Sequence, residues 1–301
     1  MADIDEGLQS WQLASNHNRM IDLQKGNAKG SASNGTAEVE LSFYGGSAFK
    51  VTSPSGLTVM IDPWRNLPTG KWDWYFHDFP RTAVDIGVST HAHFDHDALH
   101  RLDAHVLLDR LIGVYEFGDL RIIGIAEKHA TDSSSAIYDF KKIIKKFGKV
   151  DIEPPHNPRS WDNCLIIVET GDLRILHWGD NRHNPPDDIW DAIGPIDIAL
   201  LPIDGSQHVL GFQSIADITA RLKPNVVVPH HYYIWDVVQR SSTLLPVSDW
   251  VDMQPTTRTI GKASNLYSRA TMPTDTPTID YFGDHVAFDR EAWHRSRGVE
   301  G

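Results

Sequence analysis

Short runs of apolar and β-branched residues alternate with turn-forming residues along most of the chain after residue 37. Runs of this kind, bounded by Gly, Pro, Asn or Asp, predict β-strands. The predicted strands are Glu38–Phe43, Ala48–Thr52, Leu57–Ile61, Val84–Ser89, Leu120–Ile125, Leu165–Glu169, Arg174–His177, Ile196–Pro202 and Val226–Pro229. Strands come first and are then mixed with helices, in two halves, which favours two sheets packed against each other with helices outside.

Helical periodicity is confined to a few segments. The expected helices are Asp97–Leu102, a segment near Ser133–Phe147, and Gln213–Leu222. Residues 1–37 differ from the rest, because a short helix is expected around Asp5–Leu23 and the stretch from Gly26 to Gly35 has the composition of a flexible linker. We therefore expect an N-terminal arm and linker over residues 1–37 and one domain over residues 38–301.

Candidate chemistry begins directly after the strand predicted at Val84–Ser89. Three histidines and one aspartate lie within six residues there: His91, His93, Asp95 and His96. Neutral imidazole and carboxylate are zinc ligands, and a strand that ends in a ligand-rich loop presents them from a rigid element. A solvated histidine-rich loop is the alternative, but it must also explain a His or Asp at three further strand ends, namely His129, Asp180 and His231.

Together these residues make the chain resemble the metallo-β-lactamase-fold hydrolases over roughly residues 38–285. The further matching motifs are Val59-Met60-Ile61-Asp62-Pro63, the Gly179-Asp180 turn, the Leu200–Ile203 strand and Pro229-His230-His231-Tyr232. The resemblance is to the branch that includes the ascorbate-phosphate lactonase-like proteins and the phosphodiesterase that cleaves N-acyl phosphatidylethanolamine. It implies an α/β fold of the αββα sandwich type, in which two mixed β-sheets are flanked by helices.

The resemblance also implies a metal centre with one or two Zn²⁺ ions per chain. His91, His93 and His129 would hold the first ion, Asp95, His96 and His231 the second, and Asp180 would bridge them. A metal-bound hydroxide would then attack the substrate, and Asp95 could act as a general base if only one ion is bound. Mn²⁺ or Fe²⁺ would suit the same ligands.

Residues beside these ligands are candidates for orienting them or for touching substrate. Asp62 matches a position that orients metal ligands. Asn181 stands where the family carries Thr, and it either reaches the metal or substrate or caps a turn. His230 should point away from His231, because neighbouring side chains on a strand face opposite ways. His208, after the predicted Ile196–Pro202 strand, is a candidate catalytic acid.

An aromatic segment follows Asp62. Trp64 and five further large aromatic residues lie between positions 64 and 80. The fold would place this segment at the rim of the metal site, where aromatic walls suit a flat or apolar substrate. The alternative is that the rings pack under the loop or against a second subunit, and the surplus of aromatic residues leads us to expect a homodimer.

Composition narrows the function classes. The net charge is -12, which disfavours a nucleic-acid partner, and the basic cluster Lys141, Lys142, Lys145, Lys146 and Lys149 is more typical of a solvated helix face. A single cysteine, Cys164, excludes an intramolecular disulfide. We find no apolar run of membrane-helix length and no secretion signal, so we expect a cytoplasmic protein without integral membrane contact.

Three functions remain open at this point. The leading hypothesis is a metal-dependent hydrolase of a small molecule, by lactone or amide opening or by hydrolytic dehalogenation of an activated aromatic such as chlorothalonil, for which a dehalogenase of this fold offers a resemblance. The second is a phosphodiesterase acting on a lipid, cyclic nucleotide or RNA, which needs an anion-binding group from Arg65, Lys71 or Arg182. The third is a non-catalytic metal-binding scaffold.

Overall fold

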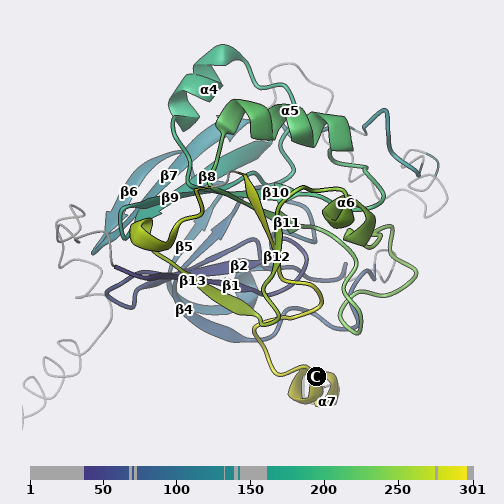
Figure 1. Ribbon diagram of the computed structural model, residues 1–301. Coiled ribbons are helices and arrows are strands. Elements are labelled where there is room, and N and C mark those ends of the chain that lie inside the picture. The colour runs from purple at the N-terminus through teal and green to yellow at the C-terminus, as the bar shows by residue number, and fades with distance from the viewer. Residues whose placement is uncertain are drawn as a thin grey trace, which may run out of the picture.

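The computed structural model describes residues 37–67, 70, 73–131, 133–138, 142, 161–274 and 277–296. Within these ranges the chain forms two β-sheets that pack face to face (Figure 1). One sheet has six strands in the order β13-β1-β2-β3-β4-β5, and the other has eight in the order β12-β14-β11-β10-β9-β8-β7-β6. Both sheets mix parallel and antiparallel pairs. The predicted sandwich of two mixed sheets is confirmed.

All nine predicted strands are present, together with five that the sequence did not indicate. The six-stranded sheet contains β1 (Val39–Phe43), β2 (Phe49–Thr52), β3 (Thr58–Ile61), β4 (Thr82–Ser89), β5 (Leu102–Asp109) and β13 (Ser264–Tyr267). The eight-stranded sheet contains β6 (Gly113–Phe117), β7 (Leu120–Glu127), β8 (Asn163–Thr170), β9 (Leu173–His177), β10 (Ile198–Pro202), β11 (Val226–His230), β12 (Thr257–Thr259) and β14 (Thr278–Tyr281). The five additional strands are β5, β6, β12, β13 and β14.

Burial explains which strands could be read from the sequence. Every residue of β10 and β11 is buried, and apart from the final His230 of β11 both strands are continuous apolar runs, as expected for parallel strands that are covered on both faces. In β5, by contrast, buried or half-buried residues alternate with exposed ones. Its exposed positions include Asp103 and Asp109, and such an edge strand carries a weak apolar signal.

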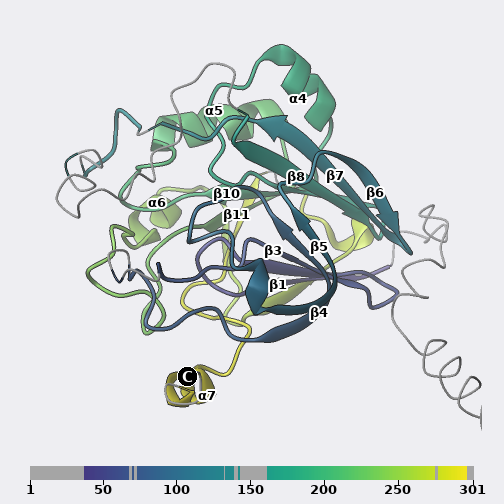
Figure 2. The same cartoon turned by 180° about the vertical axis from the view of Figure 1, so that it is seen from behind.

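Helices are few in the described part of the chain, and they are α4 (Asp187–Ile193), α5 (Phe212–Leu222), α6 (Ser248–Asp252), α7 (Arg290–Arg295) and the 3-10 turns η1 (Leu99–Arg101) and η2 (Arg269–Thr271). Figure 2 shows α4 and α5 over the outer face of the eight-stranded sheet. The α5 prediction is confirmed. The helix predicted at Asp97–Leu102 is wrong, because only the single turn of η1 forms before the chain enters β5.

Some predicted features fall wholly or largely outside the described residues. They are the N-terminal arm, the basic cluster apart from Lys142, and most of the helix predicted near Ser133–Phe147, whose described start at residues 133–138 forms turns and bends. No helix among the described residues has the length and apolarity needed to cross a membrane.

Strand direction places several chain segments at one edge of the sandwich. β9, β10 and β11 are parallel, and β7 runs the same way because two antiparallel pairings relate it to β9 through β8. In the other sheet β3 and β4 are parallel. The carboxyl ends of such strands share an edge, where α/β proteins commonly bind their ligands.

Candidate metal centre

Three histidines come together where strands of the two sheets end. His91 and His93 follow β4, and His129 follows β7. One ring nitrogen of each lies within 4.8 Å of the others. His91 Nε2 is 3.1 Å from His93 Nδ1. Three imidazoles at this spacing form one half of a candidate metal centre.

Two carboxylates and two histidines form the other half. Their ligand atoms lie within 4.8 Å of one another, and all four side chains are buried: Asp95, His96, Asp180 and His231. His231 Nε2 is 3.0 Å from Asp95 Oδ2. Asp180 faces both halves, because its Oδ1 lies 3.4 Å from His96 Nε2 and its Oδ2 lies 3.6 Å from His129 Nε2. The structure thus brings together all of the side chains for which the resemblance implies metal binding.

Asp62, directly after β3, fixes the loop that carries these ligands. Its Oδ2 lies 2.7 Å from His96 Nδ1 and accepts a hydrogen bond from Thr90 Oγ1 at 2.7 Å. Its Oδ1 accepts another from the backbone N–H of Thr90 at 2.7 Å. Because the carboxylate is fully buried and engaged with these groups, Asp62 orients His96 from behind.

His91 and His93 differ in protonation from His96 and His231. Burial, together with the neighbouring imidazoles, lowers the pKa of His91 well below its ordinary value and that of His93 to about 3. Both rings are therefore neutral at pH 7, the state in which imidazole binds metal. Burial by itself would also lower the pKa of the other two histidines. The Asp180 carboxylate instead raises the pKa of His96 well above its usual range and helps to raise that of His231 to about 10.

Unpaired ligand atoms test whether metal ions fit this cluster. Within the described part of the chain, His96 Nε2, His129 Nε2 and Asp180 Oδ1 are buried without a hydrogen-bond partner. Such orphaned atoms are rare in folded proteins. A divalent cation would satisfy donors placed between the two halves, and sets of imidazole and carboxylate suit zinc, manganese or iron. The residues present fit a centre that holds up to two ions.

His208 borders this cluster from the loop after β10. Its ring centre is 5.0 Å from that of His231. Its Nδ1 lies 2.8 Å from Ser206 Oγ and 3.1 Å from Asp204 Oδ2. Burial would raise the pKa of Asp204, but the adjacent His208 holds it below its usual range. An ionised Asp204 therefore orients the His208 ring beside the proposed ligands.

Two predicted neighbours of the ligands have polar atoms that bind groups outside the cluster. Asn181 Oδ1 accepts a hydrogen bond from Asn163 Nδ2, and its Nδ2 donates one to the backbone oxygen of Arg182, both at 3.1 Å. We therefore assign Asn181 a structural role. His230 Nδ1 lies 3.0 Å from Ser47 Oγ. His231, which lies one residue past β11 with a φ of 65°, belongs to the ligand cluster, whereas His230 does not.

The aromatic segment after Asp62 mostly forms core instead of a substrate wall. Trp64 is fully buried and stacks on Tyr75, with ring centres 4.0 Å apart and an interplanar angle of 13°. Trp64 therefore follows the alternative expectation, with its ring packed under the loop. Among the described rings of this segment, Trp74 lies close to the cluster, with its centre 6.1 Å from that of His231.

Sequence reasoning passed over several residues that support the site. His177 is buried with its Nδ1 3.8 Å from Asp62 Oδ2. Thr90 binds Asp62, and Asp204 orients His208, as described above. Thr90 lies one residue past β4 and Asp204 two residues past β10. These positions could have indicated a role in the site, because polar residues at strand ends meet at the shared edge.

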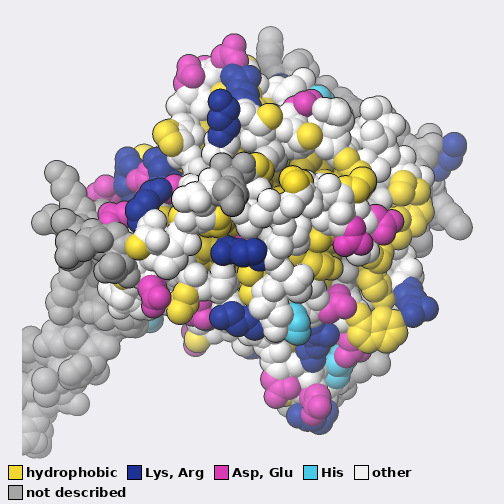
Figure 3. Space-filling view, in the orientation of Figure 1, with side chains coloured by type: hydrophobic (Ala, Val, Ile, Leu, Met, Phe, Trp, Pro, Cys, Tyr) yellow, Lys and Arg dark blue, Asp and Glu magenta, His cyan; other side chains and the backbone are white. Residues whose placement is uncertain are grey.

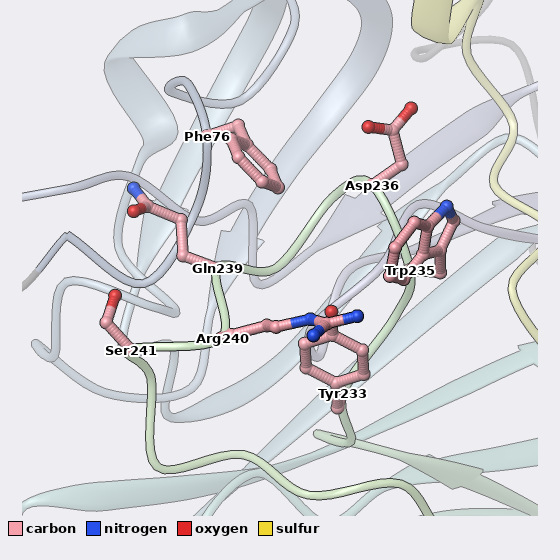
Figure 4. Close-up of a pocket in the computed structure, with 7 residues that line it drawn as sticks. All are labelled: Phe76, Tyr233, Trp235, Asp236, Gln239, Arg240 and Ser241. Atoms are coloured by element: carbon pink, nitrogen blue, oxygen red, sulfur yellow. The ribbon is translucent and has the colours of Figure 1, made fainter.

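A surface pocket is formed by Phe76 and by residues between positions 233 and 241, which follow Trp74 and His231 in the chain. Its volume is about 330 Å³, and Figure 4 shows its lining by Phe76, Tyr233, Trp235, Asp236, Gln239, Arg240 and Ser241. The Arg240 guanidinium lies 5.2 Å from the centre of the Trp235 ring. None of the proposed metal ligands lines this pocket.

Comparison with known proteins agrees with this fold. The family model described as β-lactamase superfamily domain matches residues 40–231. A UPF0173 metal-dependent hydrolase of Thermodesulfovibrio yellowstonii is 26% identical over 213 residues, covering 64% of this chain and 78% of that protein. One of Pyrococcus horikoshii is 28% identical over 211 residues, covering 65% and 86%.

A solved structure shows the same architecture. A Thermotoga maritima protein of the metallo-β-lactamase superfamily aligns with a TM-score of 0.54 at 18% identity, over 81% of this chain and 98% of that one. At this identity the likeness concerns the fold. Taken with the family model, which spans more than half of the sequence, it leads to one conclusion: the chain belongs to the β-lactamase superfamily.

Proposed function

We propose that this protein is a metal-dependent hydrolase that acts on a small molecule without a strong negative charge. The observation that carries the proposal is the largely buried cluster of His and Asp side chains, in which ligand atoms of His96, His129 and Asp180 lack hydrogen-bond partners in the described structure. A non-catalytic scaffold is disfavoured, because the His208 ring is held in a fixed orientation beside the cluster. A metal-binding scaffold would not need such a group. The names of the UPF0173 relatives, which call them metal-dependent hydrolases, support the same reading.

The proposed ligand assignment follows the two halves of the cluster. His91, His93 and His129 would hold one ion, and Asp95, His96 and His231 the other, with Asp180 between them. Zinc is the proposed metal. When bound, divalent ions lower the pKa of a coordinated water and polarise the bond under attack.

The chain's own residues would supply orientation and protons. Asp62 fixes the His96 ring, and Asp204 fixes that of His208. His208 Nδ1 faces Ser206 and Asp204. We therefore propose that His208 Nε2 donates the proton to the leaving group. Asp95 is the proposed base if a single ion is bound.

Charge pairing supports a neutral substrate over a phosphodiester. Arg182 donates from Nε and Nη2 to both carboxylate oxygens of Glu127 at 2.7 Å. Arg65 pairs in the same way with Asp97, at 2.7 and 3.0 Å. Two of the three groups that could bind a phosphate are thus already paired with carboxylates, and Lys71 lies outside the described residues.

The charge distribution also supports a small-molecule partner. On the face seen in Figure 3, basic side chains are scattered among acidic ones over the described residues. Binding of a nucleic acid generally relies on clustered Lys and Arg. We therefore propose a small organic substrate, with lactones, amides and activated aryl chlorides as candidates.

Metal analysis and a hydrolysis screen test the proposal together. Purified protein would be assayed for metal per chain and then offered lactones, p-nitrophenyl esters and anilides, chlorinated aromatics and p-nitrophenyl phosphodiesters. We expect about one or two metal ions per chain and turnover of a neutral class that is lost on chelation. Absence of bound metal, with no gain of activity on adding zinc, manganese or iron, would sink the proposal. Preferential turnover of phosphodiesters would replace the substrate class.

A further inference from the structure

A tyrosine hydroxyl lies buried near the ligand cluster without a hydrogen-bond partner. Tyr75 is fully buried, and its Oη pairs with no other described residue. Buried hydroxyls are nearly always paired, because an unpaired one loses its hydrogen bonds to water without replacement. An orphan of this kind calls for an explanation, and a group that binds beside it is one.

The position of Gly46 ties this hydroxyl to the metal centre. A Cβ added to Gly46 would lie only 2.6 Å from Tyr75 Oη, so the hydroxyl occupies the space that a side chain would need. The Gly46 carbonyl accepts a hydrogen bond from the backbone N–H of His231 at 2.8 Å. Tyr75 Oη thus packs directly against the residue that anchors the His231 backbone.

Electrostatics agree with this placement. Burial raises the pKa of Tyr75 well above its ordinary value, and the negative charges of Asp95 and Asp180 raise it further. The carboxylates of the cluster therefore act on this phenol, and it keeps its proton at neutral pH. A protonated phenol is a hydrogen-bond donor.

The surrounding structure holds the phenol in one orientation. Its ring stacks on Trp64. The Asn66 side chain pairs with the backbone of Tyr75, accepting from its N–H at 3.0 Å and donating to its carbonyl oxygen at 2.8 Å. Gln239 Nε2 donates to the same oxygen at 2.8 Å. Such support is what a preorganised donor requires.

We propose that the Tyr75 hydroxyl donates a hydrogen bond to the substrate oxygen on which negative charge develops during hydrolysis. The inference rests on the proposed function and narrows it, because an oxygen of this kind is present in lactones, esters and amides and absent from aryl chlorides. A fixed donor aimed at the developing charge needs no reorganisation during the reaction. The expected substrate is therefore a carbonyl compound.

The variant Tyr75→Phe tests this role, because it keeps the stacked ring and removes only the hydroxyl. We expect turnover of the accepted lactone or ester to fall by about 100-fold, the size seen when one such donor is lost. Metal per chain should not change. Affinity of the metal-loaded protein for acetate, a carboxylate like the reaction product, should weaken by about tenfold in calorimetry. Thermal stability should not fall, since the lost hydroxyl had no partner.

Tyr232→Phe is the matched control. Tyr232 is also buried and adjoins His231 in sequence, but its hydroxyl donates to the Gly283 carbonyl at 2.8 Å. This variant should lose thermal stability and keep both its turnover and its acetate affinity.

The role of Tyr75 would be overturned if Tyr75→Phe had the same turnover and the same acetate affinity as the wild-type protein. The same conclusion would follow from unchanged turnover if neither protein bound acetate. If the wild-type protein hydrolyses nothing in the screen, the proposed function fails by itself. The acetate comparison then still decides whether Tyr75 serves a bound oxyanion.

Discussion

At the scale of single residues, the site depends on backbone conformations that side chains rarely adopt. Asp62 and His231 both have positive φ, at 52° and 65°. A residue other than glycine is strained when its φ is positive. Such strain persists where the surrounding structure holds the backbone in place, and this is common at functional sites. At position 231 the conformation accompanies the turn that places Nε2 against Asp95, whereas the preceding His230 remains in β11 and faces Ser47.

The neighbouring histidines offer a matched pair of variants. His231→Asn removes the Nε2 atom near Asp95 and Asp180. We expect metal affinity to fall by more than about 100-fold, because losing a residue that only orients a metal ligand costs about 10- to 100-fold. His230→Asn keeps a polar atom near Ser47 and should retain its metal. Metal per chain after dialysis measures both. Full retention of metal in His231→Asn would contradict the assignment.

Protonation of the cluster predicts how metal binding depends on pH. His96 and His231 have raised pKa values, about 10 for His231, so both rings carry protons in the metal-free protein near neutrality. Metal requires neutral imidazole, so binding at both rings should release about two protons and become tighter as the pH rises from about 6 to 8. Calorimetry in buffers of different ionisation enthalpy counts these protons. Binding without proton release would show that these two rings are not ligands.

At the scale of elements, the strands that carry the site could be read from the sequence. β4, β9, β10 and β11 are largely buried runs of apolar residues, and their ends deliver ligands or ligand supports. The edge strands could not be read in this way. All three residues of β12 are exposed, so strand pairing stabilises it without any apolar pattern. The helix predicted at Asp97–Leu102 failed because parallel pairing of β5 with β4 overrides local propensity.

The turn after β9 makes an element-scale prediction. Gly179 has φ +56, and a Cβ there would lie 2.8 Å from Thr90 Oγ1. Gly179→Ala should therefore cost backbone strain of about 1–2 kcal/mol and steric strain of about 1–3 kcal/mol, and it should displace Asp180.

Gly261→Ala separates these two contributions. Gly261 has φ +66 and nothing within 4 Å of an added Cβ, so it should show the backbone cost alone. Urea unfolding of the metal-free variants measures both free energies. Equal losses of stability in the two variants would show that the space around Gly179 is not restrictive.

At the scale of the whole molecule, the site joins the two sheets. The first three imidazoles come from both β4 and β7, and Asp180 lies after β9. In the metal-free state several carboxylates and imidazoles are buried together at this junction, which carries a desolvation cost. A bound cation offsets that cost, so metal should stabilise the fold as well as support activity.

Chelation tests this coupling. We expect EDTA to lower the melting temperature and added zinc to restore it, since a ligand at about 100 times its Kd stabilises by about 2.7 kcal/mol. His231→Asn should show a smaller shift than wild type. Identical melting curves with and without EDTA, on protein shown to contain metal beforehand, would mean that the ions do not bridge the sheets.

The sequence by itself determined the two-sheet fold, the strands of its core and the set of His and Asp residues that meet at one edge. Those features are local, because burial on both faces imposes apolar runs and strand ends carry the polar residues. Only the tertiary structure decided that Trp64 is core, that Asn181 is paired internally and that Tyr75 brings an unpaired hydroxyl to the site. These outcomes depend on which segments, distant in the chain, pack against each other, and a local pattern contains no such information.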